Sequence, residues 1–430
     1  HELIQLVPEL NDFHQLDEYK HLRSKSVNTL TKGFQKKERA LYNKYHSLVS
    51  KKKEKSFYDL IFLDDLKIMI KESKYIALDH VPIDSLDNFP LSYVSALQGE
   101  TDYRFTDKKS YQDFLNRFKT IPEITETILE NMKQGLKVKD TLPRIIVLDL
   151  RDQYKSFLEQ DLDEIKVPSS RKKDIISAIQ TYINPSVQKL KDFLENEYLC
   201  KCTDKIGLNS LSGGSTIYKG LVEEQTMKGY SPKDIHELGE KEVTRLMNLI
   251  HAKKRTMKFK GSLQEFYKFT TDTFKDKKEI ITYSKSLQKE IYKKIYPKYF
   301  NVTLLEKDLA DIKNVSDDKS RLYAFYIGTK KRGTFYVNGH KHDDLNKHEL
   351  LTLTLHETVP GHHLQLMTHN RSKKLPLYIQ SSHNTGYIEG WGLYCENFTE
   401  LHTDKEMVWK YIYELQRAIR LVIDTGIHAF

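Results

Sequence analysis

The stretch from His356 to His363 holds the residue types best suited to metal chemistry. Imidazoles stand at positions 356, 362 and 363, a carboxylate at 357, and a Pro-Gly pair at 360–361. The common metallopeptidase signature is H-E-x-x-H, in which two His one helical turn apart share a face and the Glu acts as general base. Here Pro360 takes the place of the second His, so the spacing is irregular.

The longer spacing determines what the backbone must do. Ligands at i and i+4 are separated by about 6 Å of helix rise, which suits one shared ion. At i+6 or i+7 a straight helix separates them by about 9 to 10.5 Å, which is too far for a shared zinc. Proline disrupts a helix interior, and glycine reaches dihedrals closed to other residues. We therefore predict a helix break between Thr358 and Gly361 that brings His362 or His363 back over His356.

A hydrolytic zinc site needs a third protein ligand and an open position for water. The segment Glu389-Gly-Trp-Gly-Leu-Tyr-Cys-Glu396 offers two carboxylates seven residues apart on a predicted helix. We expect Gly390 and Gly392 to let this helix approach the His helix closely. Either Glu389 or Glu396 could coordinate, and the other could brace a ligand imidazole. The alternative for each acid is a solvated helix face.

The elements that position these groups are mostly helices. Up to about Cys202, apolar residues recur at helical spacing without converging chemistry, which indicates a helical scaffold. The segments 321–327 and 334–338 are aromatic and β-branched and are joined by a Lys/Arg/Gly turn, which indicates a β-hairpin. Asn346 and Glu349 then cap a helix that runs into His356. We predict a mainly α protein with a small β-hairpin or sheet.

A Gly- and Ser-rich segment at 207–215 is a candidate domain boundary. We expect a helical scaffold region over residues 1–204 and a catalytic metal-binding region over residues 205–430. The chain begins at His1 without a signal-like stretch, which is typical of a processed or trimmed piece. Four sequons slightly favour a secretory route; they lie at Asn301, Asn314, Asn370 and Asn397.

Composition argues against several other classes of protein. With 39% hydrophobic and 30% charged residues, the 430-residue chain resembles an ordinary globular protein. No run approaches the roughly 18 apolar residues of a membrane helix. The net charge of +9 comes with scattered lysines and no Arg-rich patch, so we expect no nucleic-acid partner. Three cysteines do not make a disulfide framework.

Three motifs together resemble the DUF885 family: His356-Glu-x-x-Pro-Gly-His362-His363-Leu-Gln, Glu389-Gly-Trp-Gly-Leu-Tyr-x-Glu396, and Arg417-Ala-Ile-Arg420-Leu-Val-Ile-Asp424-Thr-Gly-Ile-His428. The resemblance covers roughly residues 207–430. It implies a zinc metallopeptidase or carboxypeptidase-like hydrolase. The family pattern continues beyond the last motif, so we expect the catalytic region to be C-terminally incomplete. The missing piece is then either removed or present as a separate fragment of the same precursor.

More remotely, the family resembles helical metallopeptidases with H-E-x-G-H followed by a Glu on the next helix. That comparison implies a gluzincin-like pair of metal-binding helices beside the small sheet. It favours His362 over His363 as the second ligand, so one Zn²⁺ would lie on His356, His362 and Glu389, with Glu357 as general base. Three further residues near these motifs could either orient a ligand by a hydrogen bond or coordinate the ion in its place: His363, Glu396 and Asp424.

Other residues are candidates for contact with the substrate. His428, Tyr387 and Tyr394 could donate hydrogen bonds to a tetrahedral oxyanion. Arg417 and Arg420 could bind a substrate carboxylate, or could instead form ion pairs with Asp424 or Glu414. The strand carrying Tyr336 and Asn338 could pair with an extended peptide at its edge, unless the hairpin is closed.

The function we expect is that of a zinc-dependent hydrolase, specifically a metallopeptidase of carboxypeptidase or oligopeptidase type. Its partner would be a peptide or small amide substrate. One alternative is a metal-dependent amidase or esterase acting on non-peptide substrates, because the same ligands would serve. The other is a non-catalytic binding protein that retains the fold; the presence of Glu357 argues against it.

Overall fold

The computed structural model describes residues 1–14, 16–86, 88–98, 103, 105–226, 229–301, 304–315, 323–328, 332–372, 374–381 and 384–430. Outside this set lie residues 321–322 and 329–331 of the predicted hairpin and sequon residues 302, 303 and 316. The chain packs as two compact units, residues 1–224 with 427–430 and residues 225–426. The predicted division of roles at residue 204 remains a prediction.

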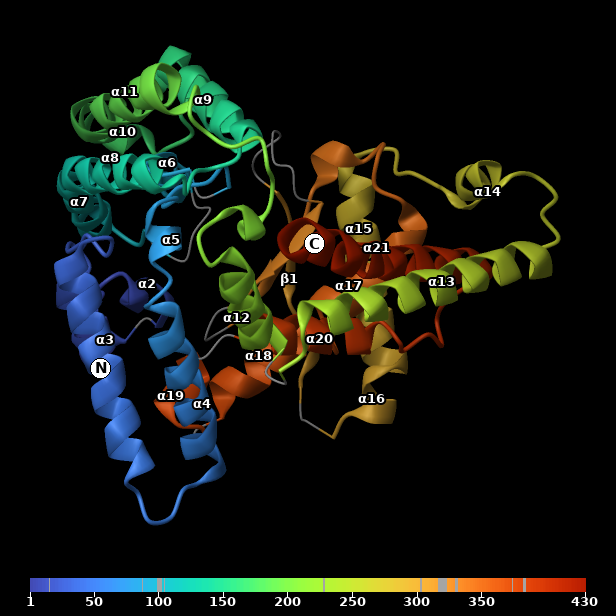
Figure 1. Ribbon diagram of the computed structural model, residues 1–430. Helices are drawn as coiled ribbons and strands as arrows, with labels where there is room; N and C mark the ends of the chain where they lie inside the picture. Colours follow the sequence, from blue (N-terminus) through green and yellow to red (C-terminus); the bar gives the residue numbers. More distant parts are fainter. Residues whose placement is uncertain are drawn as a thin grey trace. The chain divides into compact units, whose positions relative to one another are not determined.

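The first unit is built from helices around its own apolar core (Figure 1). A long helical hairpin, α3 with α4, is capped at Ser56 and Asp59 by reciprocal hydrogen bonds. The largest core cluster joins α8, α9 and α11 through Ile128, Leu150 and Leu190. The helices are α1 Glu2–Leu6, α2 Leu10–His14, α3 Lys32–Ser50, α4 Phe57–Glu72, α5 Ile76–Asp79, α6 Leu91–Leu97, α7 Lys108–Arg117, α8 Ile121–Val138, α9 Arg144–Glu159, α10 Ser169–Ala178, α11 Asn184–Phe193 and α12 Gly214–Thr226, whose last two residues belong to the second unit.

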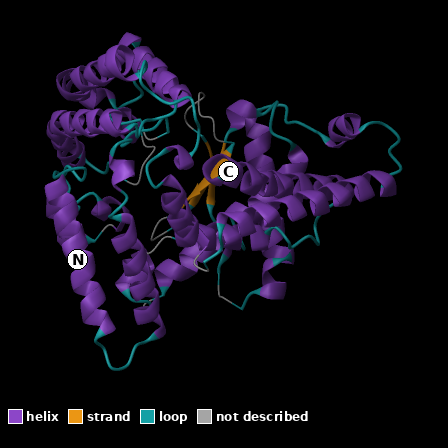
Figure 2. Ribbon diagram, viewed as in Figure 1, coloured by secondary structure: helices purple, strands orange, loops and turns teal. Residues whose placement is uncertain are grey.

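The second unit combines helices with a small sheet, drawn in orange in Figure 2. Its helices are α13 Pro232–Thr256, α14 Leu263–Thr270, α15 Lys277–Lys294, α16 Tyr296–Tyr299, α17 Lys347–Glu357, α18 His362–Arg371, α19 Leu377–Ser381, α20 Thr385–Cys395 and α21 Asp404–Ala429. Its strands are β1 Asp311–Asn314, β2 Ala324–Ile327 and β3 Thr334–Val337.

The strands form a mixed sheet in the order β1-β3-β2. β2 and β3 pair antiparallel, with Phe325 opposite Tyr336, so the predicted hairpin is confirmed within the described residues. β1 pairs parallel to β3 and was not predicted. Because β3 is paired on both sides, the prediction that an extended peptide pairs with this strand is wrong. Both of its edges are already occupied.

The sheet fixes α17 in the core of the unit. Ile312 and Phe335 from the sheet join one apolar cluster with Ile291 of α15 and Leu350 of α17. All residues of α17 from Leu350 to Glu357 are buried, as expected for a helix enclosed on every side. A mainly helical protein with a small sheet beside the candidate metal helices is therefore confirmed.

α17 begins with the predicted Asn346 side-chain cap. The Asn346 side chain accepts hydrogen bonds from the backbone N–H of His348, at 3.2 Å, and of Asp272, at 3.0 Å. Burial raises the pKa of the Glu349 carboxyl to about 7, against a smaller lowering by the backbone N–H of Asn346. The first turn of α17 therefore holds a carboxyl that binds a proton more tightly than an ordinary glutamate does.

This carboxyl should make the stability of the fold depend on pH. Its folded pKa of about 7 exceeds the ordinary value of 4.5, so its stabilising contribution is complete below about pH 4.5 and is lost as pH rises through about 7. We expect Glu349→Gln to raise the free energy of unfolding at pH 8 by up to about 3 kcal/mol and to change it little at pH 4. Urea unfolding at both pH values tests this. A variant less stable than the parent protein at pH 8 would contradict it.

Candidate metal centre

The helix that carries His356 stops one residue later. α17 ends at Glu357, residues 358–361 form a turn with a cis Val359–Pro360 peptide bond, and α18 begins at His362. A β-carbon at Gly361 would overlap the backbone carbonyl of His356. The Trp391 indole N–H donates to the carbonyl oxygens of Pro360, at 2.9 Å, and Gly361, at 3.3 Å. The predicted break between the His residues is confirmed.

The break brings His356, His362 and Glu389 together. Glu389 Oε2 lies 3.3 Å from His356 Nε2, and Glu389 Oε1 lies 3.6 Å from His362 Nε2. The two imidazole rings are 4.6 Å apart and nearly perpendicular, at 84°. Zinc bonds of about 2.0–2.1 Å in tetrahedral geometry place neighbouring ligand atoms about 3.3–3.4 Å apart. The spacing therefore fits, and these three residues could hold a metal ion.

The centre has a closed side and an open side. The side chains of His356 and His362 are 4% and 8% exposed, whereas that of Glu389 is 57% exposed. A catalytic zinc site needs a position for water or substrate beside its three protein ligands. Solvent reaches this centre on the Glu389 side.

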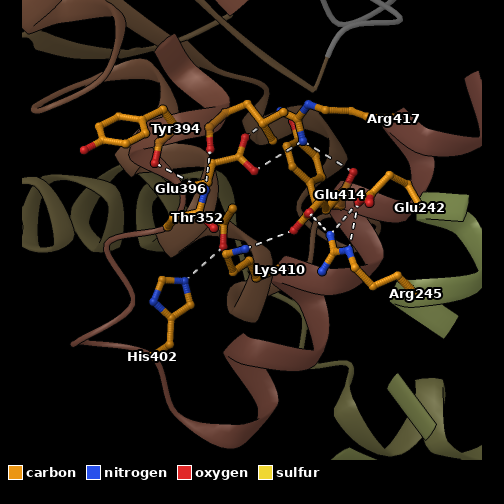
Figure 3. A network of polar contacts seen from close by, with 12 residues as sticks. Glu242, Arg245, Thr352, Tyr394, Glu396, His402, Lys410, Glu414 and Arg417 are labelled. Atoms are coloured by element: carbon orange, nitrogen blue, oxygen red, sulfur yellow. Dashed lines mark hydrogen bonds and ion pairs between the residues drawn. The ribbon is translucent and has the colours of Figure 1, made fainter. Parts of the chain in front are cut away.

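Glu396 holds His356 from behind. Its Oε1 lies 2.8 Å from His356 Nδ1, which leaves Nε2 facing Glu389. Arg417 donates to Glu396 Oε1 at 2.6 Å and to Oε2 at 3.4 Å. Figure 3 shows this pair beside a second set of ion pairs, in which Glu414 binds both Lys410 and Arg245. Glu396 is fully buried, so water cannot solvate its negative charge. Arg417 supplies the positive charge that compensates it.

The charges of the centre shift its pKa values. Burial lowers the pKa of His356, but hydrogen bonds to Glu389 and Glu396 outweigh burial and raise it to about 9. Hydrogen bonds to the two His residues hold the pKa of Glu389 well below its usual range. Burial raises the pKa of Glu357, against the attraction of His356 and His362. A buried carboxyl with a raised pKa beside a metal centre suits general-base chemistry.

His363 points to different partners from those of His362. Its Nε2–H donates to the Asp308 carbonyl oxygen at 2.7 Å, and its Nδ1 accepts from the Tyr326 hydroxyl at 2.9 Å. Burial lowers its pKa to about 4, which keeps the ring neutral. Both ring nitrogens are engaged, and His362 is the one placed with His356 and Glu389.

The two arginines lie on α21. Arg417 is bound to Glu396, a partner that was predicted for neither arginine, and its guanidinium lies 4.3 Å from the centre of the Tyr413 ring. Arg420 is exposed and donates from Nε to the Gln416 carbonyl oxygen at 3.4 Å. Asp424 is exposed one turn further along the same helix. Binding of a substrate carboxylate by the arginines remains a prediction.

The predicted oxyanion donors belong to different units of the protein. Tyr387 and Tyr394 are on α20 with 64% and 56% exposure, and Tyr394 packs against Trp391 at 5.7 Å between rings. His428 belongs to the first unit, where it stacks on Tyr218 at 5.2 Å and accepts from the Leu208 N–H at 3.1 Å. Their roles in catalysis remain predictions.

Tyr336 on β3 and Asn338 directly after it were predicted to bind substrate, and they have different surroundings. Tyr336 is half-buried and stacks on Phe325 with ring centres 5.0 Å apart. Asn338 is fully buried, and its side chain accepts from the His340 N–H at 3.1 Å, which caps the turn after β3. The described contacts thus give Asn338 a structural role.

Tyr326, Tyr413 and Asp308 were not predicted as residues near the metal centre. Tyr326 and Tyr413 both have pKa values raised by burial and by the charge of Glu357, to about 12 in Tyr413. Tyr413 lies one helical turn before Arg417, which is a signal that could have been used. The backbone carbonyl of Asp308 leaves no trace in residue type, so nothing in the sequence could have pointed to it.

Gly392 and Gly390 offer a matched test of the packing around His356. A β-carbon at Gly392 would lie 2.7 Å from both ring nitrogens of His356, whereas one at Gly390 would meet nothing within 4 Å. Only Gly392 therefore makes the predicted close approach. We expect Gly392→Ala to lower zinc affinity about 10- to 100-fold by displacing the ring, and Gly390→Ala to leave it unchanged. Competition with a chromogenic chelator measures both, and equal affinities would contradict the expected contact.

Comparisons with known proteins add a family and a fold. A solved structure described as the putative lipoprotein from Colwellia psychrerythraea matches with a TM-score of 0.83 and 18% identity, over 99% of this chain and 81% of that one. No curated protein matches the chain. Among the described residues no helix is both long and apolar enough to cross a membrane. The family model of a bacterial protein of unknown function, DUF885, matches residues 16–430, so the chain belongs to the DUF885 family.

Proposed function

We propose that the protein is a zinc-dependent hydrolase that cleaves amide bonds in peptides. The observation that carries this proposal is the convergence of His356, His362 and Glu389 beside the buried Glu357. Two imidazoles and one carboxylate form a ligand set that suits zinc and is used by zinc peptidases. The exposure of Glu389 leaves the centre accessible to water on that side.

A zinc ion held by these residues would polarise the substrate carbonyl and lower the pKa of the attacking water. Glu357 accepts the proton of that water as its oxygen adds to the carbonyl carbon. The same carboxyl then delivers the proton to the leaving nitrogen, the C–N bond breaks, and a carboxylate and an amine result. The raised pKa of Glu357 suits both directions of this transfer.

The buried acids support this chemistry from behind. Glu396 accepts the Nδ1–H of His356 and so keeps Nε2 available as a ligand. Arg417 donates to Glu396 and compensates its negative charge, which would otherwise be buried without a partner of opposite charge. These contacts fix the ring of His356 before any metal binds.

Zinc analysis combined with Glu357→Gln tests the proposal. We expect the purified protein to bind one zinc ion and to hydrolyse members of a peptide library. Glu357→Gln should retain the zinc and lose at least about 100-fold in kcat/KM, because the base is removed and the ligands are not.

The control is Glu349→Gln, which neutralises a second carboxyl on the same helix, eight residues before Glu357. It should leave kcat/KM unchanged. Absence of tightly bound zinc would overturn the metal centre, and activity in Glu357→Gln within about tenfold of the parent would overturn the assignment of the base.

A further inference from the structure

We propose that the outer edge of β2 binds the substrate as an added β-strand, so that the preferred substrate is an extended peptide. This inference rests on the proposed peptidase function and names its substrate class. β3 lies between β1 and β2, and β2 pairs with β3 along one side only in the described part of the sheet. The opposite edge strand, β1, packs against α15.

The register identifies which groups face outwards. In an antiparallel pair, opposing residues alternate between those that exchange both backbone hydrogen bonds and those that exchange none. The Asn338 N–H donates to the Tyr323 carbonyl at 2.8 Å, so Tyr323 belongs to a bonded pair. Phe325 and Ile327 follow in the same phase. The backbone N–H and C=O groups of Ala324 and Tyr326 therefore point away from β3, where a further strand would pair.

The same strand is tied to the metal-binding helix. The Tyr326 hydroxyl donates to His363 Nδ1 at 2.9 Å, and His363 directly follows the candidate ligand His362. Further along, a β-carbon at Gly328 would lie 2.8 Å from the Leu366 side chain of α18. The backbone of Tyr326 thus faces outwards, while its side chain contacts the residue next to the candidate ligand His362. A peptide held by that backbone would have a fixed register relative to the centre.

The chemistry of this edge favours a backbone partner over a particular side chain. Main-chain hydrogen bonds to an edge strand give affinity, and the surfaces on either face of the sheet select alternate side chains. Phe325 and Tyr336 stack at 5.0 Å and 17° on one face and are half-buried. We expect Phe325 to favour an apolar side chain at the substrate residue that lies directly opposite it on the same face.

A scan of N-methylated peptides tests the proposal on the unmodified, zinc-loaded protein. A peptide that the protein cleaves is remade with one backbone nitrogen methylated at each successive position. Only alternate residues of an added strand bond to the edge, so kcat/KM should fall about threefold to tenfold at every second position. At intervening positions it should stay within about twofold. Equal losses at all positions, or none, would overturn the added strand.

A backbone variant provides the second measurement. Ala324→Pro removes an outward N–H without touching the β2–β3 bonds, and Ala324→Val keeps that N–H as the matched control. We expect a threefold to tenfold loss for the proline variant on extended peptides and no difference between the variants on an acylated dipeptide. If the proline variant does not fold, the N-methyl scan alone decides.

The two proposals fail in different ways. If no peptide is cleaved, or if cleavage survives Glu357→Gln, the peptidase function is wrong. If cleavage depends on Glu357 but N-methylation shows no alternation and the two Ala324 variants match, the enzyme stands and the β2 edge is wrong.

Discussion

The turn between α17 and α18 has no room for a side chain at Gly361, because the carbonyl of His356 already occupies that space. The turn is also held from outside by Trp391, which donates its indole N–H to the carbonyls of Pro360 and Gly361. The Gly361 carbonyl also accepts from the Gln365 backbone N–H at 3.0 Å, in the first turn of α18. The tryptophan comes from α20, the helix that also carries Glu389 and is directly followed by Glu396. One contact therefore shapes the turn and brings the third candidate ligand to the two imidazoles.

The second constraint is the burial of charge. His356, Glu396 and Arg417 form a set in which each group compensates the next, and Glu396 has almost no contact with solvent. Buried ion pairs of this kind rarely add to stability, because desolvation consumes most of the attraction. Their effect here is orientational. The imidazole cannot rotate without losing its bond to Glu396 and colliding with α20 at Gly392.

The helix break and the β-hairpin could be predicted from residue types and their spacing. The need for a helix break followed from six-residue spacing and a Pro-Gly pair, and the hairpin followed from aromatic alternation. The choice between His362 and His363 could not be made from spacing, because adjacent helical residues differ in direction by about 100° and the restart of α18 sets that direction. β1 was missed because its four residues include three polar ones and only one buried apolar side chain.

The uneven exposure of the three candidate ligands has a kinetic consequence. Two of them are buried and cannot move apart without disturbing the core, while Glu389 stands at the solvent boundary. Ion exchange would then proceed by detachment of one carboxylate, with both imidazoles remaining in place. Ion entry would follow the reverse order, so that the exposed carboxylate meets the ion while both imidazoles are already in position.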